Sequence, residues 1–157
     1  MSAQGNTTGE RWSQLSRSER IALGKEIVAD RLESIGCTVQ LPNSLVDGKL
    51  AVRTPSGGAV EVFVSTQRIG GYVFWTTRRL QPTADRFAAI VLLADGDAPD
   101  VYLVPSTEWC NASPPFTDRD NVGKRSEPEY GISLARSSLP ALQRYRWNER
   151  SARSLFR

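Results

Sequence analysis

Carboxylates and arginines are the residues of this chain with which chemistry or ligand binding could be done. The 157 residues include 17 aspartates and glutamates, 20 lysines and arginines, and no histidine. The lack of histidine excludes Ser-His-Asp and Cys-His catalysis, histidine acid–base catalysis and most catalytic zinc sites. Cys37 and Cys110 are far apart and lack the spacing of a zinc site or a secreted disulfide framework. What remains is carboxylate chemistry, with or without a hard metal ion, or binding alone.

The arginines gather in two groups that could contact a polyanion. Arg68, Arg78 and Arg79 flank a segment that carries Tyr72 and Trp75. The second group lies in the last stretch of the chain, where Glu149 is the single acid: Arg136, Arg144, Arg146, Arg150, Arg153 and Arg157. Arginine forks suit phosphates, but a solvated face and a frayed tail would carry the same residues. Both interpretations stay open, and the net charge of +3 permits a polyanionic partner without requiring one.

The tryptophans divide in the same way. We expect Trp75 and Trp109 to pack in the core, because aromatic residues in strands are more often buried than presented to a ligand. Trp147 stands among arginines, and it is the better candidate for stacking on a base or for a cation–π contact.

Apolar patterning predicts the sheet that must position these residues. Val60, Val62 and Val64 alternate with Glu61 and Phe63, a period of two that is typical of a strand with two different faces. Residues 90–93 are continuously apolar, as expected for a central strand covered on both faces. Glycine-rich and aspartate-rich turns bound the predicted strands, which cover residues 50–53, 59–65, 72–76, 88–94 and 101–104.

Helical patterns flank this sheet. An apolar stripe and a serine cap predict a helix over residues 18–35, and a shorter helix is expected over 139–146. Residues 111–128 are rich in Pro, Asp and Asn and indicate a long surface loop before a late strand at 132–134. We therefore expect one α/β domain over 16–147, a flexible N-terminal tail over 1–15 and a basic tail over 148–157. No signal peptide or membrane span is evident, which favours a cytoplasmic protein.

The order of these segments resembles the PD-(D/E)xK nuclease superfamily, the restriction-endonuclease-like fold, and in particular its small bacterial members. A helix is followed by Asp47-Gly48-Lys49-Leu50-Ala51-Val52 and a hairpin into residues 60–68 (VEVFVSTQR). Residues 72–75 (YVFW), 88–93 (AAIVLL), 99–109 (PDVYLVPSTEW) and 145–147 (YRW) continue the resemblance. It covers roughly residues 18–147 and implies a central mixed sheet flanked by helices.

In that family two strand-borne acids hold a divalent metal, and a lysine two residues after the second acid helps to activate water. The resemblance implies Asp47 and Glu61 as the metal-binding acids and Glu26 as a helix-borne acid. The lysine position would then be Phe63, or Ser65 if the strand is aligned by its ending. Neither alignment has the acid-x-Lys pattern, so a displaced lysine could come only from Lys25 or Lys49.

Three interpretations of Asp47, Glu61 and Glu26 remain open: turn and surface residues, a vestigial metal pocket, or a rearranged nuclease site. Phe63 beside Glu61 argues against a water-filled metal pocket. We therefore expect a nucleic-acid-binding or assembly subunit that has lost its catalytic residues, with DNA as the first candidate partner and a role in bacterial defence or DNA processing. The alternatives are an active endonuclease using magnesium or manganese, and a protein-binding immunity or antitoxin-like module. A homodimer paired at a strand such as 72–76 would fit any of them.

Overall fold

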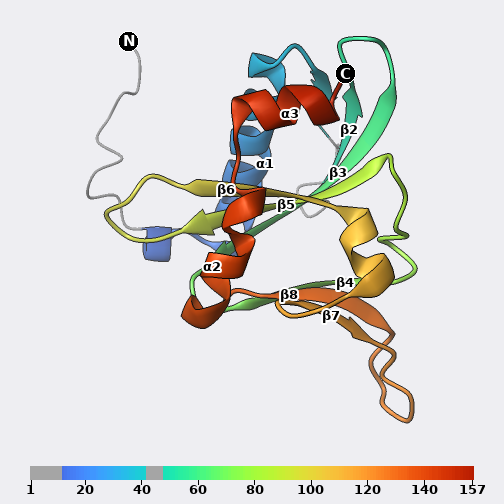
Figure 1. Cartoon of the computed structure of the whole chain (residues 1–157). Coiled ribbons are helices and arrows are strands. Elements are labelled where there is room, and N and C mark those ends of the chain that lie inside the picture. Colours follow the sequence, from blue (N-terminus) through green and yellow to red (C-terminus); the bar gives the residue numbers. More distant parts are fainter. Residues whose placement is uncertain (1–11, 42–47) are drawn as a thin grey trace.

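The computed structural model describes residues 12–41 and 48–157, and it is built on a five-stranded mixed sheet (Figure 1). The order is β1-β2-β3-β5-β6, in which β3 and β5 are parallel and the other neighbours are antiparallel. The strands are β1 (Thr38–Gln40), β2 (Lys49–Arg53), β3 (Ala59–Arg68), β5 (Arg86–Leu93) and β6 (Asp100–Pro105). The central mixed sheet flanked by helices that the sequence predicts is confirmed.

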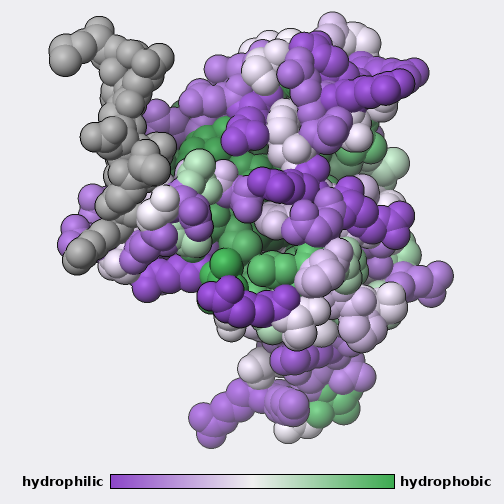
Figure 2. All heavy atoms as spheres, turned by 60° about the vertical axis from the view of Figure 1, so that its left-hand side comes forward, coloured by the Kyte–Doolittle hydropathy of each residue, from purple (hydrophilic) through white to green (hydrophobic). Residues whose placement is uncertain are grey.

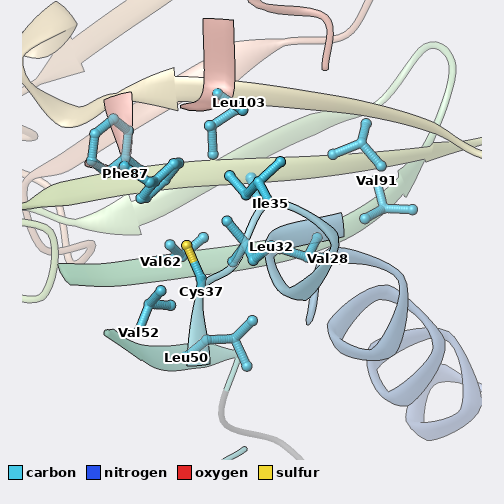
Figure 3. Packing of buried hydrophobic residues seen from close by; sticks show 14 of the residues in the cluster. Val28, Leu32, Ile35, Cys37, Leu50, Val52, Val62, Phe87, Val91 and Leu103 are labelled. Carbon is cyan, nitrogen blue, oxygen red and sulfur yellow. The ribbon is translucent and has the colours of Figure 1, made fainter. Parts of the chain in front are cut away.

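One face of this sheet is covered by α1 (Arg17–Ser34). The helix begins with a capping box, in which Ser16 Oγ accepts from the Glu19 N–H at 3.2 Å and Glu19 Oε1 accepts from the Ser16 N–H at 2.9 Å. Val28 and Leu32 project from the helix onto the sheet, where they meet side chains such as Val62 (Figure 3). The predicted helix and the observed one agree to within a residue at each end.

The other face is covered by a second sheet, which the sequence did not predict. Its order is β4-β8-β7, built from β4 (Tyr72–Thr76), β7 (Phe116–Arg119) and β8 (Glu129–Ser133). The predicted strand at 72–76 does not join the main sheet beside β3, because β3 is already flanked by β2 and β5. The turn at Gly70, whose φ is +96° and whose N–H donates to Leu134 O at 2.8 Å, redirects the chain into the second sheet. The expected 111–128 loop likewise contains β7.

The C-terminal residues are also more ordered than expected. The predicted helix over 139–146 is split into α2 (Leu139–Leu142) and a 3-10 turn, η4 (Gln143–Tyr145). Most of the expected basic tail forms α3 (Glu149–Leu155), which Asn148 caps by accepting from the Ser151 N–H at 3.0 Å. Phe156 is buried against Phe87, with 4.9 Å between ring centroids. The sequence did not indicate the apolar face formed by Ala152 and Phe156, because arginines dominate this segment.

The described part of the N-terminal segment also packs. In η1 (Trp12–Gln14), Trp12 is buried and its Nε1 donates to Asp97 O at 3.1 Å, so a flexible tail does not extend to residue 15. Another 3-10 segment, η2 (Ser106–Asn111), carries Trp109 into the core between the two sheets. Trp75 is buried there too, as predicted. Among the described residues, no helix combines the length and the apolar character needed to cross a membrane.

Candidate nucleic-acid interface

Glu61 of β3 is held by two cations from neighbouring strands. Its Oε2 lies 3.0 Å from Lys49 Nζ on β2, and its Oε1 accepts from Arg86 Nε on β5 at 3.0 Å. The hydrogen bond from Lys49, and then that from Arg86, lower the pKa of Glu61 below its ordinary value. Each carboxylate oxygen is therefore occupied by a cation of the protein itself.

The predicted catalytic set does not converge in the structure. The even-numbered β3 residues, such as Val62, pack toward α1, whereas Phe63 packs toward the second sheet. Glu61 shares the face of Phe63, so it is on the opposite side of the sheet from Glu26, which is exposed on α1. Asp47 lies outside the described residues. Lys25 is buried on α1.

This arrangement does not fit a divalent metal. Within residues 12–41 and 48–157 no three acidic or sulfur side chains are grouped so that they could share an ion. Glu61 would have to break its bonds to Lys49 and Arg86 in order to become a ligand. Phe63, which is only 3% exposed, fills the adjacent position on the same face with an aromatic ring, as the sequence suggested. The residues that the structure describes therefore do not form a site for a metal-dependent step.

A pocket of about 600 Å³ lies on the α1 side of the sheet, where the helix begins and β3 ends. Arg17 and Arg20 come from the first turns of α1, and Arg68 comes from the end of β3. Ser65 and Gln67 add polar atoms to the lining, and none of the described lining residues is acidic. The pocket is thus an opening bordered by three guanidinium groups.

Close packing between α1 and β3 sets the position of these arginines. Gly24, one turn beyond Arg20, lies directly against Thr66, and a Cβ at position 24 would overlap Thr66 Oγ1. That hydroxyl oxygen is buried without a hydrogen-bond partner. The missing side chain at Gly24 therefore lets the helix approach the strand, which brings Arg17 and Arg20 alongside Arg68.

Two smaller pockets adjoin this one through shared lining residues. The next, of about 410 Å³, shares Arg68 and Ile69 with the first and adds Arg136. The third, of about 330 Å³, shares Ile69 with the second and is bordered by Arg146. We call these three adjoining pockets the arginine groove. Figure 2 shows a face of the molecule on which apolar side chains are visible in a recess between hydrophilic ones.

Three acids, Asp95, Asp97 and Asp100, line the two smaller pockets, and Asp95 and Asp100 have partners within the protein. Asp95 accepts from the N–H and Oγ of Ser13 at 3.2 and 3.0 Å, and these bonds, more than Arg68, lower its pKa. Asp100 pairs with Arg146 at 2.8 Å. By contrast, Arg17, Arg20, Arg68 and Arg136 form no ion pair with any residue that the structure describes. Their guanidinium groups are available to an external anion.

The other arginines predicted to bind nucleic acid have partners within the protein. Arg78 pairs with Glu127 at 3.0 Å, and Arg79 lies over the Phe63 ring at 5.5 Å. Arg144 lies over the ring of Tyr145 at 5.4 Å. Trp147 packs against the core beneath α1, and its backbone N–H donates to Val101 O at 2.7 Å.

Of the predicted binding residues, Arg68 and Arg146 border the arginine groove, while Arg17, Arg20 and Arg136 were missed. Arg17 and Arg20 are three residues apart at the start of a predicted helix, a spacing that places both on one side of the helix. This spacing could have identified Arg17 and Arg20 as candidate binding residues from the sequence.

Three comparisons with known proteins bear on the fold. No protein-family model matches the sequence, and no curated protein is similar enough to count as a relative. Among solved structures, the chain is similar to Hjc, a Holliday junction resolvase from Archaeoglobus fulgidus, with 8% sequence identity and a TM-score of 0.49. The match covers 85% of this chain and 94% of the resolvase. The similarity is one of fold alone.

Proposed function

We propose that this protein binds nucleic acid without cleaving it and that phosphates occupy the arginine groove. The observation that carries the proposal is the separation of charges between the two sides of the main sheet. On one side Glu61 is neutralised by Lys49 and Arg86, and on the other Arg17, Arg20 and Arg68 border a pocket without an acid among its described lining residues.

Arginine suits this role because its planar fork can donate two hydrogen bonds to a phosphate. Three guanidinium groups around one pocket offer a polyanion several contacts at once. Each phosphate that they neutralise releases condensed counterions, so affinity should fall steeply with salt. Such contacts hold the backbone and carry no sequence preference by themselves.

The absence of cleavage is proposed from the chemistry of Glu61. Metal-assisted hydrolysis needs carboxylates that are free to ligate and a lysine that is free to act on water. Here Lys49 is bound to the acid that it would have to assist. DNA is the first partner to be tested. The proposal includes a role in bacterial DNA processing or defence.

The test is a salt-titrated binding assay with labelled single- and double-stranded DNA and RNA, with and without manganese, followed by a denaturing gel of the same samples. We expect binding that weakens with salt and intact strands in every lane. Metal-dependent fragments would contradict the proposal and would support the endonuclease alternative. A lack of binding at low salt would instead favour a protein partner.

A matched pair of variants places the site. Arg17→Ala combined with Arg20→Ala should weaken binding at least about tenfold, because two phosphate contacts are lost. Arg150→Ala combined with Arg157→Ala removes the same charge from exposed positions outside the arginine groove and should have little effect. Equal losses in both variants would show a general charge effect rather than a groove.

A further inference from the structure

The outer face of the second sheet carries a stack of three side chains. The rings of Tyr72 and Phe74 lie nearly parallel, with 6.1 Å between centroids and 24° between planes. The guanidinium carbon of Arg119 lies 4.8 Å from the centroid of the Tyr72 ring. Phe74 is 55% exposed, which is unusual for so large an apolar side chain in the middle of a strand.

Hydrogen bonds to the neighbouring strands hold Tyr72 in place within the stack. The Tyr72 hydroxyl donates to Glu129 Oε2 at 2.8 Å and lies 2.7 Å from Thr117 Oγ1. Burial raises the pKa of Tyr72, so the hydroxyl keeps its proton and remains a donor. Gly131 makes room for the ring, because a Cβ there would overlap the Tyr72 hydroxyl. Tyr72 is therefore held across β8, and Phe74 packs on a rigid neighbour.

We propose that Phe74 is a stacking platform for an unpaired base of a single-stranded nucleic acid whose backbone lies in the arginine groove. This inference rests on the proposed function and adds the strand type to it. Every base has a ring face that can stack on an aromatic side chain, but that face is covered by neighbours in a duplex. An exposed phenylalanine beside cations therefore favours a single strand.

Phe74 and the first pocket lie on different faces of the molecule, the outer face of the second sheet and the α1 side of the main sheet, and the turn before β4 joins the two faces. Gly71 lines the first pocket and immediately precedes Tyr72, the first residue of β4. The five residues of β4 extend about 17 Å at about 3.4 Å per residue. Arg68, which lines the first pocket, precedes β4 in the sequence, and Arg78 follows it. The ion pair of Arg78 with Glu127 is exposed, and such pairs are easily exchanged for a phosphate.

A second copy of the chain is the competing occupant, because β4 is at the edge of its sheet as described. Charge favours a polyanion instead, because Arg119 lies over Tyr72 beside the stack and its guanidinium group would attract a phosphate.

The experiment uses the full chain with a labelled single strand and a duplex of the same sequence, each as DNA and as RNA. Phe74→Leu keeps an apolar side chain but removes the ring, and Phe74→Trp keeps a ring. We expect Phe74→Leu to weaken single-strand binding about tenfold, within the range of one lost stacking contact, and to leave duplex binding unchanged. Phe74→Trp should bind the single strand as the wild type does, with a change of tryptophan fluorescence on binding that the wild type does not show.

Several outcomes decide the proposal. The platform is wrong if Phe74→Leu weakens single-strand and duplex binding equally. It is also wrong if Phe74→Leu weakens neither. It is also wrong if the wild type is a dimer that Phe74→Leu dissociates, since a second copy would then cover the ring. If Arg17→Ala with Arg20→Ala weakens binding while Phe74→Leu does not, the platform falls and the groove stands. If the wild type binds no nucleic acid at low salt, the platform and the proposed function are both wrong. If the platform is supported, the DNA and RNA samples identify which single strand is preferred.

Discussion

The ammonium nitrogen of Lys49 lies 3.0 Å from Oε2 of Glu61, on neighbouring strands of the main sheet. These are the lysine and the acid that the resemblance to nucleases offered as working partners. In the structure they neutralise each other, and Arg86 occupies the second carboxylate oxygen. Both carboxylate oxygens of Glu61 are therefore held by side chains of the neighbouring strands.

The ion pairs of Glu61 should make a small, pH-dependent contribution to stability. Folding lowers the pKa of Glu61, so the contribution is present above the unfolded pKa of about 4.3 and is lost as the pH falls through the lower folded pKa. Because the side chain is 35% exposed, we expect Glu61→Gln to cost less than about 1 kcal/mol at neutral pH. Urea unfolding at neutral pH and well below the unfolded pKa measures this difference. A cost that persists or grows in acid would contradict the ion-pair explanation.

Local patterns were enough to predict much of the fold. The alternation of Val60 and Val62 with Glu61 identified β3, and the apolar run at 90–93 identified β5 as a strand covered on both faces. The serine cap and stripe identified α1 to within a residue. These features depend on neighbours in the sequence, which is why they can be recognised without a structure.

The second sheet and the groove depend on contacts between distant residues. β4 pairs with β8, whose residues follow it by more than fifty positions, and nothing local distinguishes that partner from β3. Likewise, the position of Arg17 relative to Arg68 follows from how closely α1 packs on β3, which Gly24 controls. Glu26 and Glu61 were grouped by family pattern, but the faces of α1 and β3 separate them.

The contact between Gly24 and Thr66 should be sensitive to added volume. Gly24→Ala would place a methyl group on Thr66 Oγ1, and overpacking of this kind costs about 1–3 kcal/mol. Thr66→Val keeps the shape but removes an unpartnered hydroxyl, so it should be neutral or stabilising. Thr66→Ala should relieve part of the Gly24→Ala penalty in the double variant. Urea unfolding of the wild type, Gly24→Ala, Thr66→Ala and the double variant gives the coupling free energy. Strictly additive costs would show that the two residues do not touch.

The two cysteines should differ sharply in reactivity. Cys110 is exposed on η2, whereas Cys37 is only 6% exposed and burial raises the pKa of its thiol. In the folded protein an aromatic disulfide reagent should label Cys110 quickly and Cys37 only after unfolding. Cys110→Ser is the matched control and should abolish the fast phase. Two fast thiols in the native protein would mean that the packing beneath α1 opens readily.

Salt dependence is the most direct measure of the arginine groove. Each arginine that contacts a phosphate adds about 1 to the slope of log K against log salt, because one condensed counterion is released. Arg17→Ala combined with Arg20→Ala should therefore lower the slope by about two, while Arg150→Ala with Arg157→Ala should leave it unchanged. Circular dichroism of both variants checks that they fold. A weaker affinity with an unchanged slope would indicate damage to the fold rather than lost phosphate contacts. An equal fall in both variants would show a general charge effect rather than binding in the arginine groove.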